Sequence, residues 1–196
     1  GGMEVLVAPL KGSGMVRDAV MVRAGMAHEP ANRAGLVGLL AAMLDEGAGE
    51  LDATALNDEF DYYGIRLSGD SARDYTSISL TTLARHQEVA WARLADAVLR
   101  PRFDQEPLER MRSALLDGLL DDEESPGSVA INALVQMLYK GHPYGRPSNG
   151  TAKGVKAITR EELVTFHQRA FRGPNLILAV AGEVDPKQLL SRLNGH

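Results

Sequence analysis

The sequence predicts an α+β fold, with a mainly antiparallel β-sheet and helices packed on it. Three observations support this class. Short segments in the first half of the chain have the apolar-polar alternation of strands. The helical patterns are grouped between pairs of strands and do not alternate with them one by one. A further strongly apolar segment, residues 175–184, supplies a strand near the C-terminal end.

The expected strands begin with two apolar-rich segments, residues 3–8 and 16–24, in which Val and Met recur at alternating places in the second. Residues 65–69 and 75–82 follow as a second pair. In the latter segment Thr76, Ile78 and Leu80 alternate with small polar residues. Such alternation is typical of antiparallel strands with one face packed and one face wet.

Helical patterns occupy the stretches between these strands. Residues 34–46 are rich in Leu, Ala and Met and nearly apolar all round, which predicts a buried helix. Asp52 or Thr54 can cap the next helix, which runs through Tyr62 and ends at Gly64. The remaining expected helices cover residues 86–99, 107–122, 128–139 and 159–171, and a short one begins at Pro186.

Composition limits the classes of function. With 196 residues, 44% apolar and 24% charged, we expect one globular domain over residues 1–196, as a piece of a longer protein. A net charge of -5 disfavours nucleic-acid binding. The chain contains no cysteine, so disulfides and thiolate metal sites are excluded. No apolar run approaches the roughly 20 residues that span a bilayer, so we expect no membrane span.

Several segments, taken in order, resemble the insulinase/pitrilysin family of zinc peptidases. Their order and spacing carry the resemblance over nearly the whole chain, because no one of them is specific alone. The segments are Arg23-Ala24-Gly25 and residues 35–47, 58–64, 99–103, 139–145, 158–163 and 175–184.

The zinc motif of that family is missing where the resemblance locates it. Residues 35–43 read G-L-V-G-L-L-A-A-M, where active members carry H-x-x-E-H inside G-L-x-H-L-L-E-H-M-L. In that motif two His one helical turn apart bind zinc, and the Glu activates a water molecule. Gly38, Ala41 and Ala42 stand at the first His, the Glu and the second His. The third ligand, a Glu on a later helix, corresponds to Gly118, or to Asp117 if the register slips by one residue.

The resemblance therefore implies no catalytic residue, no metal ligand and no cofactor in this domain, and zinc only in a catalytic partner. The family pairs similar domains into a clamshell around a peptide chamber. We expect a noncatalytic domain that joins a catalytic zinc metallopeptidase half, fused or separate, and assists peptide binding. Alone it should bind no catalytic zinc and cleave no peptide.

Two alternatives remain. The chain could be a zinc metallopeptidase with an unusual ligand set such as His142, His167 and Glu183. It could also be a purely structural subunit, like the core proteins of respiratory complexes that resemble the family. The bacterial periplasm is slightly favoured over the cytoplasm as its compartment.

One capacity can survive the loss of the motif. In active relatives the strand after the second helix offers an open edge, to which the peptide adds as an extra strand. Leu67, Ser68, Gly69 and Asp70 fall on the matching segment. Main-chain hydrogen bonding needs no catalytic side chain. The alternative, equally weighted, is that a partner or a loop covers this edge.

Removal of the motif side chains also predicts a change in packing. Protein interiors are close-packed, so we expect the facing helices to close up or bulkier neighbours to fill the gap. Ala41 and Ala42 should then be mostly buried, with the Asp117–Gly118 helix close by. We also expect one exposed apolar face for a companion to cover.

Overall fold

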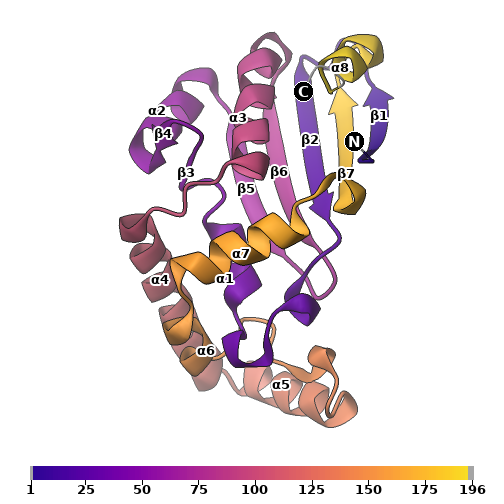
Figure 1. Ribbon diagram of the computed structural model, residues 1–196. Helices are drawn as coiled ribbons and strands as arrows, with labels where there is room; N and C mark the ends of the chain where they lie inside the picture. The colour runs from indigo at the N-terminus through magenta and orange to yellow at the C-terminus, as the bar shows by residue number, and fades with distance from the viewer. Residues whose placement is uncertain (1, 194–196) are drawn as a thin grey trace.

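The computed structural model describes residues 2–193, and its central element is a five-stranded sheet in the order β1-β7-β2-β6-β5 (Figure 1). Strand β1 pairs with β7 in parallel, and the other neighbouring pairs are antiparallel. A separate two-stranded hairpin joins β3 and β4. The strands are β1 (Glu4–Pro9), β2 (Met15–Val22), β3 (Gly47–Ala48), β4 (Leu51–Asp52), β5 (Arg66–Ser71), β6 (Thr76–Leu83) and β7 (Leu176–Gly182).

Helices α1, α3 and α7 lie across one face of the sheet, and α4, α5 and α6 extend beyond its lower end (Figure 1). The helices are α1 (Leu36–Ala42), α2 (Ala53–Tyr63), α3 (Gln87–Leu99), α4 (Gln105–Glu124), α5 (Pro126–Leu138), α6 (Ala152–Ala157), α7 (Arg160–Ala170) and α8 (Pro186–Leu193). Short 3₁₀ helices η1 (Met26–His28) and η2 (Ala31–Arg33) lead into α1. The α+β class is thus confirmed.

The core lies between the sheet and the helices on it. Along β6, Thr76, Ile78 and Leu80 are buried, while the residues between them are only half-buried, as the alternation predicts. Strands β2 and β7 alternate in the same way. One face of the sheet therefore packs against the helices, and the other is left with exposed or half-buried side chains.

Several helix boundaries follow from caps visible in the sequence. The Asp52 carboxylate accepts a hydrogen bond from the Ala55 N–H at 2.9 Å and begins α2. Gly64 ends that helix in the left-handed region, at φ 64°. Thr159 and Glu162 form a reciprocal capping box at the start of α7. These caps lie where the sequence predicts them.

Other features of the fold differ from the predictions. Helix α1 covers only Leu36–Ala42, because Gly35, at φ 106°, precedes it and the chain turns after Ala42. Helix α6, the β3–β4 hairpin and the parallel pairing of β1 were not predicted. These depend on contacts between distant segments that local periodicity does not encode.

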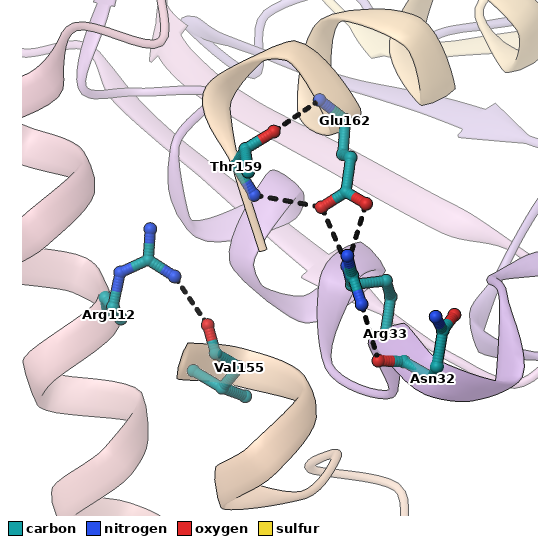
Figure 2. Close-up of polar contacts among 6 residues, drawn as sticks. All are labelled: Asn32, Arg33, Arg112, Val155, Thr159 and Glu162. Atoms are coloured by element: carbon teal, nitrogen blue, oxygen red, sulfur yellow. Dashed lines mark hydrogen bonds and ion pairs between the residues drawn. The ribbon is translucent and has the colours of Figure 1, made fainter. Parts of the chain in front are cut away.

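Side-chain contacts tie together the segments that surround α1 (Figure 2). The Arg33 Nε donates to both carboxylate oxygens of Glu162, at 2.7 and 2.9 Å, and so ties η2 to the start of α7. The Arg112 guanidinium of α4 donates to the Val155 carbonyl of α6. Helix α1 contacts α4, α6 and α7, so these hydrogen bonds between its neighbours help to fix its surroundings.

Candidate functional site

The segment before α1 holds the start of this helix through one buried carboxylate. Glu29 accepts hydrogen bonds from the Gly35 and Val37 N–H groups, each at 3.2 Å. These are donors that a helix start leaves without an internal partner. Burial raises the pKa of Glu29, and the two hydrogen bonds and the nearby Arg146 oppose that rise. Glu29 is thus buried, whereas a carboxylate beside a helix start commonly faces solvent.

Helix α1 lies directly on the backbone of edge strand β5. A Cβ atom built on Gly69 would lie 2.1 Å from the Ala41 carbonyl oxygen and 2.9 Å from its carbon. No side chain fits in that space, so glycine is required there for close approach. A Cβ on Gly38, in contrast, would meet only the Ser71 hydroxyl, at 3.8 Å.

Three positions of the missing motif lie on α1, which packs on β5 and contacts α4, and the fourth lies on α4. Ala41 is buried at 2% exposure, as expected, but Gly38 and Ala42 are only half-buried. Helices α1 and α4 contact each other, yet Gly118 is exposed and a Cβ on it would meet no atom within 4 Å. The expectation that the gap is closed or filled is therefore wrong beside Gly118.

The residues at these positions do not fit a catalytic zinc ion. Catalytic zinc takes three protein ligands with nitrogen, oxygen or sulfur donors. Gly38, Ala41, Ala42 and Gly118 have no side-chain donor, and Asp117 is a single exposed carboxylate. Within residues 2–193 no group of three or more His, Cys, Asp or Glu side chains is arranged to hold a metal.

The alternative ligand set is not brought together. The His142 Nδ1 accepts a hydrogen bond from the Tyr144 N–H, at 3.2 Å. The buried His167 on α7 contacts the Val98 carbonyl through its Nε2, at 2.9 Å, and burial lowers its pKa. The Glu183 carboxylate, after β7, accepts from the Gly14 N–H at 2.9 Å. Each of the three groups thus has its own local structural contact.

The predicted substrate-binding segment is β5, at the edge of the sheet. Leu67 is buried and Gly69 lies against α1, whereas Ser68 and Asp70 are exposed. Within the part of the chain that the structure describes, β5 pairs with no strand other than β6.

Sequence reasoning missed a buried carboxylate on β2. Asp18 is fully buried, and its Oδ1 accepts a hydrogen bond from the Trp91 indole at 3.2 Å, while Oδ2 has no hydrogen-bond partner among the described residues. Burial raises the pKa of Asp18 to about 6. The signal was present, because Asp18 alternates in phase with Val16, Val20 and Val22.

Comparison with known proteins identifies the class. The sequence profile of the Insulinase family (Peptidase family M16) matches residues 10–152. The chain therefore belongs to this family of peptidases and peptidase-like proteins. The chain spans about half the length of the relatives that it matches. None of the helices among residues 2–193 is long and apolar enough to cross a membrane.

The relatives include proteins named as zinc proteases, a protein named as a non-peptidase and a subunit of the cytochrome b-c1 complex. An uncharacterized zinc protease of Mycobacterium leprae is 28% identical over 196 residues, all of this chain and 44% of the relative. A non-peptidase homolog of Helicobacter pylori is 28% identical over 88% of this chain and 40% of its own length. Subunit 1 of the bovine cytochrome b-c1 complex is 25% identical over 90% of this chain and 37% of its own length.

The solved structures agree. The peptidase M16 inactive domain from Pseudomonas fluorescens is 28% identical, with a TM-score of 0.91 over 97% of this chain and 46% of its own. The first half of the Escherichia coli periplasmic protease PqqL has the same fold, with a TM-score of 0.87 at 16% identity over 99% of this chain and 43% of its own. The chain thus resembles a noncatalytic member of the family.

Proposed function

We propose that this chain is a noncatalytic peptidase-like domain that pairs with a catalytic zinc metallopeptidase half and helps to enclose and bind peptide substrates. The observation that carries the proposal concerns the motif positions on α1 and α4. These positions have no metal donor, while α1 remains fixed on the edge strand by the Gly69–Ala41 contact. In this proposal the domain keeps the edge strand that would bind peptide and lacks the side chains that would bind zinc.

Binding of peptide would use the outer edge of β5. An extended peptide adds to an open edge through main-chain hydrogen bonds, and its alternate side chains contact the flanking surface. The exposed Ser68 and Asp70 lie beside that edge. The catalytic half would supply zinc and the water-activating carboxylate, neither of which this domain provides.

The test combines the purified chain with a catalytic half from the same genome, chosen for an intact H-x-x-E-H motif. We expect the two to co-elute on a sizing column, and peptide hydrolysis to exceed that of the catalytic half alone. Elemental analysis should find zinc only in the catalytic half. If the two proteins do not co-elute and hydrolysis does not increase, the proposal is contradicted.

Edge binding has its own test. The probe is a fluorescent extended peptide taken from a substrate of the pair, with a matched peptide that is N-methylated at alternate residues. Because N-methylation removes main-chain donors, the methylated peptide should bind much more weakly. Equal binding of the two would show that β5 does not bind by strand addition.

A purely structural role is the second candidate, and similarity to the bovine cytochrome b-c1 subunit favours it. In that case the chain would join a stable complex without increasing hydrolysis in the experiment above. A periplasmic location stays a prediction, which cell fractionation can test.

A further inference from the structure

Helix α5 is apolar and yet almost entirely uncovered. Its sequence, Pro126–Leu138, contains no charged residue, and none of its residues is buried. Three large apolar side chains form what we call the α5 stripe and are 55% to 68% exposed: Ile131, Leu134 and Leu138. Soluble monomers rarely leave contiguous apolar surface of this kind in water, so the stripe indicates a contact surface.

The stripe lies on a different side of α5 from the residues that pack on the rest of the chain. The half-buried residues Ser128, Asn132 and Val135 mark the side of α5 that packs on its surroundings, and α5 contacts α4. Ile131, Leu134 and Leu138, with Gly127, follow a spacing of four, three and four residues on another side. That spacing places them in one seam along the helix, as in two-helix packing.

We propose that the α5 stripe binds the same stripe of a second copy of this chain, with the two helices antiparallel. A two-fold axis makes such a contact self-complementary. With the axis between residues 132 and 133, Ile131 meets Leu134 of the second copy. Gly127 then faces Leu138 of that copy. A Cβ on Gly127 would meet only the Ser125 hydroxyl, at 4.0 Å, so there is room for the leucine.

The charges that flank α5 select the antiparallel orientation. The acidic run of residues 121–124 precedes the helix, and Lys140 follows it. In the antiparallel register Glu124 lies near Lys140 of the second copy, at both ends of the pair. A parallel pair would bring the two acidic runs together, and like charges at an interface oppose association.

The first test is oligomeric state against concentration, by analytical ultracentrifugation of the purified chain. A short helix pair gives a small interface, so we expect a reversible dimer with a Kd of about micromolar order. Leu134→Glu should weaken it by about 100-fold or more, because each dimer would bury two carboxylates. Leu99→Glu, at a similarly exposed leucine on α3, is the matched control and should leave the dimer unchanged.

The second test examines orientation. Lys140→Glu and Glu124→Lys should each weaken the dimer by about two- to fivefold, as exposed ion pairs contribute little. The double variant should restore it, because both ends then exchange sign together. Rescue is a result that general damage to the fold would not give. Circular dichroism of each variant checks that the helices are retained.

Each other outcome overturns the proposal. A monomer at all concentrations would do so, as would a dimer that Leu134→Glu leaves intact. A chain that stays monomeric but loses binding to a catalytic half in the Leu134→Glu variant would assign the stripe to that partner. Binding to phospholipid vesicles without self-association would assign it to a membrane surface.

Discussion

Two regions beside helix α1 contrast in how much space they leave. On the β5 side, Gly69 and the Ala41 carbonyl are so close that not even a methyl group fits between them. On α4, which also contacts α1, Gly118 is exposed, and a Cβ on it would meet none of the described atoms within 4 Å. We call the β5 contact the closed side, and it orients α1. We call the surroundings of Gly118 on α4 the open side, and Gly118 is the position of the family's third zinc ligand. Close backbone packing thus helps to keep α1 in place on β5, although the motif positions have no side-chain metal donor.

The largest effect is expected when the zinc-binding side chains of the family motif are restored. The variant with Gly38→His, Ala41→Glu, Ala42→His and Gly118→Glu should bind about one zinc per chain, since a catalytic zinc needs three ligands. The wild type should bind none. Elemental analysis after dialysis is the measurement.

A matched variant tests the register of α4. It carries Asp117→Glu in place of Gly118→Glu, with the other three changes kept. If Gly118 is the third position, this variant should bind zinc more weakly. A folded four-residue variant without zinc would show that α1 and α4 are not placed as in active members.

The next largest effect is expected on the closed side. Gly69→Ala places a methyl group against the Ala41 carbonyl and should lower the free energy of unfolding by about 3 kcal/mol, a large overpacking cost. Urea denaturation measures it. A variant as stable as wild type would mean that α1 can move away from β5 freely, and the closed side would not be a fixed frame.

Strand β2, apart from the α1–β5 contact, contains a buried carboxylate, Asp18, whose removal should stabilise the fold. The pKa of Asp18 is about 6, above the value of 3.8 for an exposed group, so the folded state binds its proton more tightly than the unfolded state. The stabilisation is fully present below pH 3.8 and is lost as the pH rises through about 6. Asp18→Asn should therefore be more stable than wild type at pH 8, by roughly 2 kcal/mol.

The difference between Asp18→Asn and wild type should shrink as the pH falls toward 4. Denaturation of both proteins across this range is the measurement, and the wild type serves as the control at each pH. If the difference in stability does not change with pH, the pKa of Asp18 is the same in the folded and unfolded states.

The smallest effect is expected on the open side. Gly118→Ala meets no atom within 4 Å and removes a glycine from the interior of α4. We expect it to raise stability by about 0.5–1 kcal/mol, through the helix preference of alanine. This variant is also the matched control for Gly69→Ala. A destabilised Gly118→Ala would show that the space is not open.

Much of this fold was predictable from local patterns. The alternation in β6 and the caps at Asp52, Gly64 and Thr159 are local, and the structure has them where the sequence predicts. The end of α1 was not predictable, since Met43 and Leu44 are as apolar as the helix itself and are buried in a turn. Composition shows that a segment is buried, and not where its helix stops.

The candidate site divides in the same way. The missing donors at Gly38, Ala41 and Ala42 can be seen in the sequence, because glycine and alanine have none. The open space at Gly118 depends on how α4 is placed in the folded chain, which local sequence patterns do not encode. Asp18 was partly predictable. Its phase in β2 indicated that the side chain is buried, whereas its charge favoured a solvent-exposed position.

The sheet order has a consequence for how the chain folds as it is synthesised. Strands β1 and β2 emerge first, but β7, which lies between them, emerges last. Until then one edge of β2 stays unpaired and β1 has no partner. Pairing across such sequence distances is slow, and an open strand edge is prone to aggregate. The nascent chain should therefore depend on a chaperone more than its modest size suggests.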